Sequence, residues 1–154
     1  MKKFIDLISE CLGDVGEIMP WDLEERLEAN PDLLIVDVQE PYEYEAMHIK
    51  GSLSAPRGIL ESACEWDYEE TIPELVNARD REIVVVCRSG YRSVLSSFSM
   101  KMLGYQNVVS LKTGLRGWND YEQPLVGKDD VPVDMEVADE YFIPNLREDQ
   151  LSPK

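Results

Sequence analysis

The chain has 154 residues, of which 44% are hydrophobic and 30% charged, as is typical of a globular domain whose core is large enough to fold alone. No apolar run reaches the roughly 18 residues of a membrane span, so no membrane association is expected. The net charge of −16 argues against nucleic acid as a partner, because phosphate binding needs a basic surface.

The charge is unevenly distributed along the chain. Residues 1–50 carry 13 acids and 4 bases, residues 119–154 carry 10 acids and 3 bases, and residues 51–118 carry 8 of each. We interpret the acidic ends as solvated surface. The arginines of the neutral middle can still hold a small anionic ligand locally.

The numbers of cysteine and histidine residues argue against a disulfide framework and against a metal site. Three cysteines do not make a disulfide framework, and an odd number leaves at least one thiol unpaired. With one histidine and no Cys-x-x-Cys pair, we expect no metal site built from protein side chains. The N-terminus begins with lysines, but Asp6 and Glu10 interrupt its apolar stretch, unlike a secretory signal. We therefore expect a cytoplasmic protein.

The N-terminal third is expected to contain two helices and two strands. Residues 1–15 predict a helix because five apolar side chains share one face: Phe4, Ile5, Ile8, Cys11 and Leu12. A second helix at 21–29 ends at Asn30 and Pro31. The apolar run "LLIVDV" at 33–38 predicts a buried strand, "EPYEYEAM" a polar turn or short helix, and 52–55 a short strand.

The middle of the chain continues the alternation of strands and helices. Expected there are helical patches at 57–64 and 71–78, a strand at 82–87, a helix at 92–104 that ends at Gly104, a strand at 107–111 and a short helix at 114–120. In the helix at 92–104, the side chains expected to face inward are Val94, Leu95, Phe98 and Leu103. This alternation predicts an α/β fold with a mainly parallel central sheet flanked by helices.

The C-terminal segment has a different character. Residues 121–154 contain many acids and no core pattern beyond "EYFI" at 140–143. Such a segment cannot bury enough apolar surface to fold alone. We expect an extended tail that lays Tyr141, Phe142 and Ile143 on an apolar patch of its own domain or of a second copy. The alternatives are a disordered, solvated tail and a docking strip for a basic partner protein.

The stretch "VVVCRSGYRS" at 84–93 places a thiol where a buried strand ends. In an open α/β sheet, ligands bind at the carboxyl ends of the strands, and Cys87 is at such an end. The loop 88–92 leads into a helix that begins near Arg92 or Ser93. Loop N–H groups and the positive end of a helix dipole both favour a thiolate at this place.

The residues after Cys87 form a candidate anion-binding loop. Arg88 and Arg92 bring positive charge and can bind an incoming oxyanion. Gly90 allows a backbone conformation that a side chain would oppose. Ser89 and Ser93 supply hydroxyl donors, and Tyr91 supplies an aromatic side chain for the wall of the pocket. Only four residues separate Cys87 from Arg92, one fewer than in cysteine phosphatases, which favours a single extra sulfur atom over a phosphoryl group.

Three ordered motifs resemble the single-domain form of the rhodanese, or thiosulfate sulfurtransferase, family. "LLIVDVQEPYEYEAMHIKGSLSAP", "CRSGYRS" and "LGYQNVVSLKTGLRGW" are similar to its N-terminal signature, catalytic loop and C-terminal signature. The resemblance covers about residues 16–124, which leaves an N-terminal helical extension (1–15) and an acidic C-terminal extension (125–154). The departures are Gln39 for arginine, Met47 for glycine and Thr113 for glycine, and Gln39 puts one surface ion pair in doubt.

The resemblance implies a rhodanese-like fold and a sulfurtransferase that carries sulfur on Cys87 as a persulfide. A small anionic donor or a persulfide would supply the sulfur, and a thiol, cyanide or a sulfur-carrier protein would remove it. Such covalent chemistry requires no cofactor. Asp37 is expected to organise the loops, and His48 to lie in a structural turn. Arg57 is expected either to bind the donor or to form a surface salt bridge, and Cys64 is a candidate resolving thiol.

Two other classes of function stay open from the sequence. A non-catalytic rhodanese-like recognition module is one, although such modules often lack the cysteine. An arsenate reductase or phosphatase on the same scaffold is the other, and the loop length speaks against it. The sequence does not decide the oligomeric state.

Overall fold

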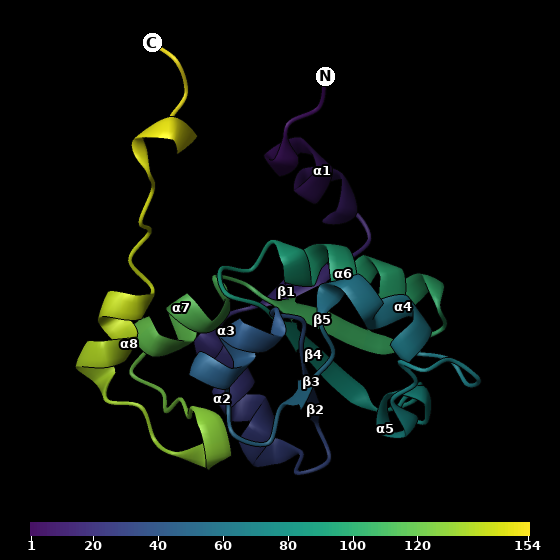
Figure 1. The fold of residues 1–154 in the computed structure, drawn as a ribbon. Helices are drawn as coiled ribbons and strands as arrows, with labels where there is room; N and C mark the ends of the chain where they lie inside the picture. The colour runs from purple at the N-terminus through teal and green to yellow at the C-terminus, as the bar shows by residue number, and fades with distance from the viewer.

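Five parallel strands form the central sheet of the computed structural model, which describes residues 1–154 (Figure 1). The strand order is β1-β5-β4-β2-β3. The strands are β1 (Gly16–Ile18), β2 (Leu34–Asp37), β3 (Leu53–Ser54), β4 (Glu82–Val86) and β5 (Asn107–Leu111). The expected α/β class is confirmed. The edge strand β1 was not predicted, because three residues are too few for a periodicity to appear in the sequence.

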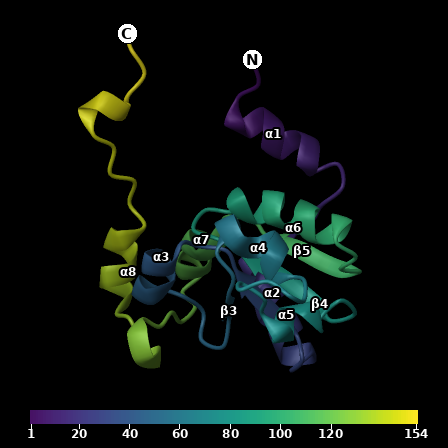
Figure 2. The same ribbon diagram turned by 45° about the vertical axis from the view of Figure 1, so that its right-hand side comes forward.

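Eight α-helices accompany the sheet, and none is long and apolar enough to cross a membrane. They are α1 (Phe4–Cys11), α2 (Pro20–Ala29), α3 (Pro41–Ala46), α4 (Leu60–Ala63), α5 (Pro73–Val76), α6 (Arg92–Met102), α7 (Gly114–Asp120) and α8 (Met135–Tyr141). Two views of the ribbon agree that α1 lies beyond α6, outside the sheet layers, and that α8 lies beside α7 (Figures 1 and 2).

Successive side chains of the central strands point to opposite faces of the sheet and so divide the apolar core into two clusters. Val36 and Val85 belong to one apolar cluster, which includes residues of α4, α5 and α6. Ile35 and Val84 belong to the other, which includes residues of α2, α7 and α8. A strand points successive side chains to opposite faces, so a continuous apolar run is needed where both faces are covered. This explains why "LLIVDV" and "EIVVVC" have no polar side.

Helix α6 packs on the sheet through small residues. Three serines are fully buried, whereas Leu95 and Phe98 are only partly buried and pack against α1 with Val94. The helix ends as expected: Gly104 has φ +93°, and Tyr105 N–H donates to the carbonyl of Met100. The buried serines are Ser93, Ser96 and Ser97.

The two ends of the chain differ from the sequence-based prediction. In α1 only Ile8 and Cys11 are buried, whereas Phe4 and Ile5 are exposed, because α1 rests on α6 by one side of its C-terminal half. The C-terminal segment was expected to be extended, but residues 135–141 form α8. The i, i+4 pair Ala138 and Phe142 enters the core, which gives this short helix a buried side.

The docking of the tail begins earlier than expected. Leu125 and Val126 are already buried, and Val126 exchanges two backbone hydrogen bonds with His48. Of the three residues expected to dock, Phe142 is buried, Tyr141 is partly buried and Ile143 is exposed. The C-terminal segment is therefore part of the packed structure up to Phe142.

Candidate active site

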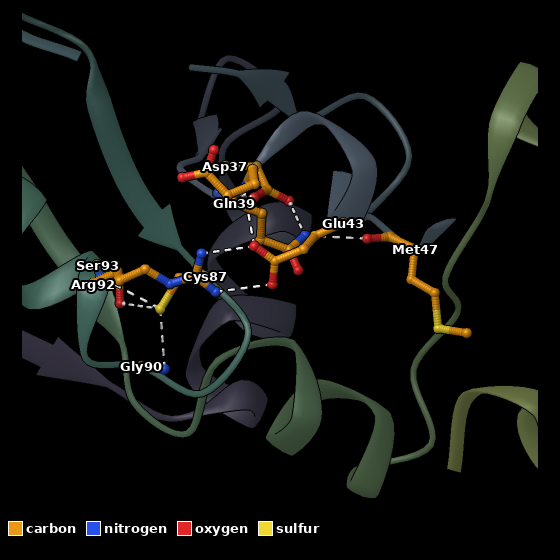
Figure 3. A network of polar contacts seen from close by, with 9 residues as sticks. Asp37, Gln39, Glu43, Met47, Cys87, Gly90, Arg92 and Ser93 are labelled. Carbon is orange, nitrogen blue, oxygen red and sulfur yellow. Dashed lines mark hydrogen bonds and ion pairs between the residues drawn. The ribbon is translucent and has the colours of Figure 1, made fainter. Parts of the chain in front are cut away.

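Cys87 directly follows β4, and its sulfur is enclosed by the loop that leads into α6 (Figure 3). The side chain is only 1% exposed. The amide of Gly90 donates to Sγ at 3.1 Å and that of Ser93 at 3.3 Å, and the Ser93 hydroxyl oxygen lies 3.4 Å away. Ser110 on β5 donates to that hydroxyl at 2.8 Å and fixes its position. Sγ therefore sits in a group of donors suited to a negatively charged sulfur.

The loop has further donors that the protein itself does not use. The backbone amides of four residues donate to no protein acceptor: Arg88, Ser89, Tyr91 and Arg92. Because α6 begins at Arg92, the positive end of its dipole lies at the same place. These unused amides belong to the same loop as Gly90 and Ser93, whose amides already donate to Sγ.

Two glycines bring the loop against the start of α7. Gly90 has φ +96°, and a Cβ there would lie 2.9 Å from the amide nitrogen of Thr113. Gly114 has φ +61°, and a Cβ there would lie 2.5 Å from the carbonyl oxygen of Cys87. Leu115 N–H donates to that same carbonyl at 2.9 Å. The catalytic loop and α7 are therefore in backbone contact, which leaves no room for side chains at these two positions.

Thr113, directly before Gly114, has a strained backbone conformation. Its φ is +68°, a left-handed conformation that costs a β-branched residue about 1–2 kcal/mol. Glycine relieves that strain but loses about 0.5–1 kcal/mol through the greater freedom of the unfolded chain. We predict that Thr113→Gly stabilises the fold by about 0.5–1 kcal/mol, seen as a higher urea midpoint with an unchanged m value. A lower midpoint would show that the threonine side chain is needed.

The Arg92 guanidinium pairs with a buried carboxylate from α3. Its two terminal nitrogens donate to the two carboxylate oxygens of Glu43 at 2.7 and 2.9 Å (Figure 3). Burial raises the pKa of Glu43, but the hydrogen bonds from Arg92 and from the Glu40 amide outweigh it, so that pKa is lowered. The hydrogen bond to Glu43 likewise raises the pKa of Arg92. The sequence analysis did not single out Glu43.

Arg88 is held by the C-terminal extension. Its guanidinium donates to the backbone carbonyl of Tyr141 at 2.7 Å. It also lies over two aromatic rings, at 4.8 Å from the Tyr141 centroid and 5.5 Å from that of Phe142. Both arginines expected to bind an anion thus have partners within the chain. The structure brings the two arginines, Ser93 and Gly90 together around Cys87, while the Ser89 side chain is exposed.

Asp37 ends β2 within a buried network. One of its oxygens accepts from the Gln39 amide at 2.9 Å and the other from Gln39 Nε2 at 3.1 Å, which also donates to the Met47 carbonyl (Figure 3). Gln39 is 1% exposed and takes part in this buried network instead of the surface ion pair that its identity had put in doubt. Burial raises the pKa of Asp37 to about 7, against the two hydrogen bonds from Gln39, which lower it.

Asp37 makes the stability of the protein depend on pH. Between about pH 4 and pH 7, folded Asp37 keeps a proton that the unfolded chain releases, so stability falls as the pH rises. A shift of this size corresponds to at most about 4 kcal/mol. We predict that Asp37→Asn removes this fall, measured by urea unfolding from pH 4 to pH 8. Asp32→Asn, at an exposed acid, is the matched control. An unchanged slope in Asp37→Asn would contradict the prediction.

The remaining candidates lie outside the loop. Arg57 pairs with Glu61 at 2.9 Å, the surface salt bridge that the sequence left open. His48 stacks on Tyr44 at 3.8 Å, and its Nδ1 lies 2.7 Å from the Tyr44 carbonyl oxygen, as befits a structural turn. Cys64 is fully buried, and burial raises the pKa of its thiol, which disfavours the thiolate that a resolving cysteine needs.

Tyr91 was expected to form the wall of the pocket. The Tyr91 ring is 44% exposed and meets the Phe4 ring edge-to-face at 5.7 Å. No group of three or more histidine, cysteine, aspartate or glutamate side chains is arranged to hold a metal ion. All three cysteines are unpaired and buried.

Comparison with known proteins identifies the family. The model of the rhodanese-like domain matches residues 19–121. The chain therefore belongs to the rhodanese-like domain family, which confirms the resemblance seen in the three motifs.

Individual relatives agree with this assignment. A protein named sulfurtransferase from Allochromatium vinosum is 30% identical over 112 residues, which are 73% of this chain and 95% of that protein. YrkF of Bacillus subtilis, whose name suggests a sulfur carrier protein, is 33% identical over 110 residues, 71% of this chain. The chain spans only about half the length of YrkF, 54%. A structure from Rhodopseudomonas palustris, named a possible tyrosine phosphatase, shares the fold with a TM-score of 0.73 and 24% identity, over 81% of this chain and 95% of that one.

Proposed function

We propose that this protein is a sulfurtransferase that carries sulfane sulfur on Cys87 as a persulfide. The observation that carries the proposal is the environment of Sγ, which accepts hydrogen bonds from two backbone amides of a loop whose other four amides donate to no protein acceptor. The names of the relatives from Allochromatium vinosum and Bacillus subtilis support sulfur transfer. Three unpaired cysteines support a reducing compartment such as the cytoplasm.

The reaction would proceed by double displacement. The Cys87 thiolate attacks the outer sulfur of thiosulfate or of a persulfide, the S–S bond of the donor breaks, and sulfite or a thiolate leaves. The loop amides then stabilise the outer sulfur of the Cys87 persulfide, as an oxyanion hole stabilises an oxyanion. In the second step a thiol, cyanide or the cysteine of a carrier protein attacks this sulfur, and Cys87 leaves as a thiolate. No redox partner is consumed.

The alternatives are supported less well. Phosphoryl transfer on a cysteine loop needs the arginine to face the substrate, but Arg92 is committed to Glu43 by two hydrogen bonds. A pure recognition module has no need for a thiol among convergent amide donors. The sulfur-carrying role accounts for both observations.

Intact mass measurement tests the proposal. The protein is incubated with thiosulfate or with glutathione persulfide, desalted and analysed with and without dithiothreitol. We expect a gain of about one sulfur atom that the reductant removes, as sulfur held by a cysteine should behave. No gain with either donor would overturn the proposal. Faster hydrolysis of an aryl phosphate than sulfur transfer would favour the phosphatase alternative.

A further inference from the structure

The positive charges expected to attract a small anionic donor are already balanced at the loop. Arg92 is bound by Glu43, and Glu40 lies close enough to raise the pKa of Arg92 further. Arg88 is covered by the Tyr141 carbonyl and two aromatic rings. Both guanidinium groups are therefore already engaged within the chain, that of Arg92 by a carboxylate and that of Arg88 by a carbonyl and two rings. A free dianion such as thiosulfate gains little attraction from this arrangement.

Both chain extensions reach the catalytic loop. From the N-terminal side, the Phe4 ring contacts the Tyr91 ring. From the C-terminal side, Tyr141 and Phe142 hold Arg88. All three of these contacting residues lie outside the part of the chain that matches the family, residues 19–121. The surroundings of Cys87 are therefore built in part by segments particular to this chain.

These same segments also carry exposed apolar side chains on the two sides of the loop. We call the exposed apolar residues of α1, the loop and the α8 region the rim. The rim consists of Phe4, Ile5, Leu7, Tyr91, Val137 and Ile143, which are between 41% and 62% exposed. The two parts of the rim flank the loop, α1 through the contact of Phe4 with Tyr91 and the α8 region through the contact of Tyr141 with Arg88. Exposed apolar and aromatic side chains beside a site are typical of protein–protein interfaces.

The charge of the chain indicates what covers the rim. Residues 125–154 carry 8 acids and 3 bases, and the whole chain carries −16. Two copies of this chain would repel one another, whereas a basic partner would be attracted and steered toward the site. Sγ is only 1% exposed, so the partner's reactive group must protrude from its surface.

We propose that the rim is the docking site of a positively charged protein whose cysteine, on a protruding segment, exchanges sulfur with Cys87. This inference rests on the proposed persulfide chemistry. In the delivering direction, the Cys87 thiolate attacks the outer sulfur of the partner's persulfide, the partner's S–S bond breaks, and its cysteine leaves as a thiolate that takes up a proton. The reverse sequence unloads Cys87.

Charged model donors test the docking. Two synthetic peptides of equal length each carry one cysteine persulfide, flanked by four lysines in one and by four glutamates in the other. We expect loading of Cys87 from the lysine peptide to be at least about tenfold faster at low ionic strength, as electrostatic steering predicts. The ratio should fall below about threefold in 0.5 M salt, because salt screens exposed charges. Equal rates at low salt would overturn the inference.

Variants with altered surface charge show which part of the molecule causes the difference in loading rate between the two peptides. Glu136→Lys/Glu140→Lys changes two exposed acids of α8 and should lower the lysine-to-glutamate ratio at least about threefold. Glu136→Gln/Glu140→Gln, which disturbs the start of the helix less, should lower it in the same direction. The matched control Glu69→Lys/Glu70→Lys adds the same charge on the exposed loop between α4 and α5 and should leave the ratio higher than the α8 variants do.

The outcomes separate this inference from the proposed function. If the peptides and glutathione persulfide all load Cys87 at one rate, the chemistry stands and the docking site is refuted. If none of them loads Cys87, the proposed function itself fails. Light scattering that shows a stable dimer, in which Phe4→Ser/Ile5→Ser restores the monomer, would assign the rim to a second copy of the chain and overturn the basic partner.

Discussion

Cys87→Ser should abolish sulfur transfer while the protein stays folded. Serine is close in size to cysteine and can accept the same amide hydrogen bonds from Gly90 and Ser93. It cannot form a persulfide, so the covalent route is closed. We expect kcat/KM for transfer from thiosulfate or from glutathione persulfide to fall by at least about 10³-fold. Intact mass should show no added sulfur.

The other two cysteines are the controls for this experiment. Cys11 lies between α1 and α6, and Cys64 is fully buried in the core beside Tyr105, with its pKa raised by burial. Cys11→Ser and Cys64→Ser should each retain the sulfur gain, although a buried hydroxyl costs some stability. Sulfur that stays on the protein in Cys87→Ser, or transfer that is lost in Cys64→Ser, would mean that Cys87 does not act alone.

The parts of the site that are local in sequence were predictable. The apolar run of β4 stops at Cys87, and α6 begins five residues later, so the loop and its thiol could be placed from the pattern alone. Gly90 was expected at a special backbone conformation, and its φ is +96°. These features depend on short-range rules of strand, turn and helix start, which a single sequence displays.

The parts that depend on distant residues were not predictable. Glu43 and Arg92 are 49 positions apart, and Arg88 and Tyr141 are 53 apart, so no periodicity links them. An arginine beside a cysteine therefore suggested anion binding, whereas the fold supplies each arginine with a partner within the chain. Likewise, the only deeply buried residues of this region are Ala138 in α8 and Phe142 directly after it, too few to reveal a helix in the sequence.

Gly114→Ala should damage both the fold and the catalytic loop. The new Cβ would lie 2.5 Å from the carbonyl oxygen of Cys87 and 2.7 Å from the carbonyl carbon of Arg88, both backbone atoms that cannot swing aside. The φ of +61° adds the ordinary strain of a left-handed alanine. We expect a loss of about 3 kcal/mol or more in the free energy of unfolding, a size characteristic of overpacking combined with backbone strain.

Gly104→Ala separates the two causes. Gly104 also has a positive φ, +93°, but nothing lies within 4 Å of its added Cβ. It should therefore lose only about 1 kcal/mol, the cost of the backbone conformation alone, and keep full sulfur transfer. In Gly114→Ala, the folded fraction should also load sulfur more slowly, because the displaced carbonyl of Cys87 shifts the loop amides around Sγ. Equal losses of stability in the two variants, with full transfer in both, would show that the loop tolerates the displacement and that its contact with α7 does not position the thiol.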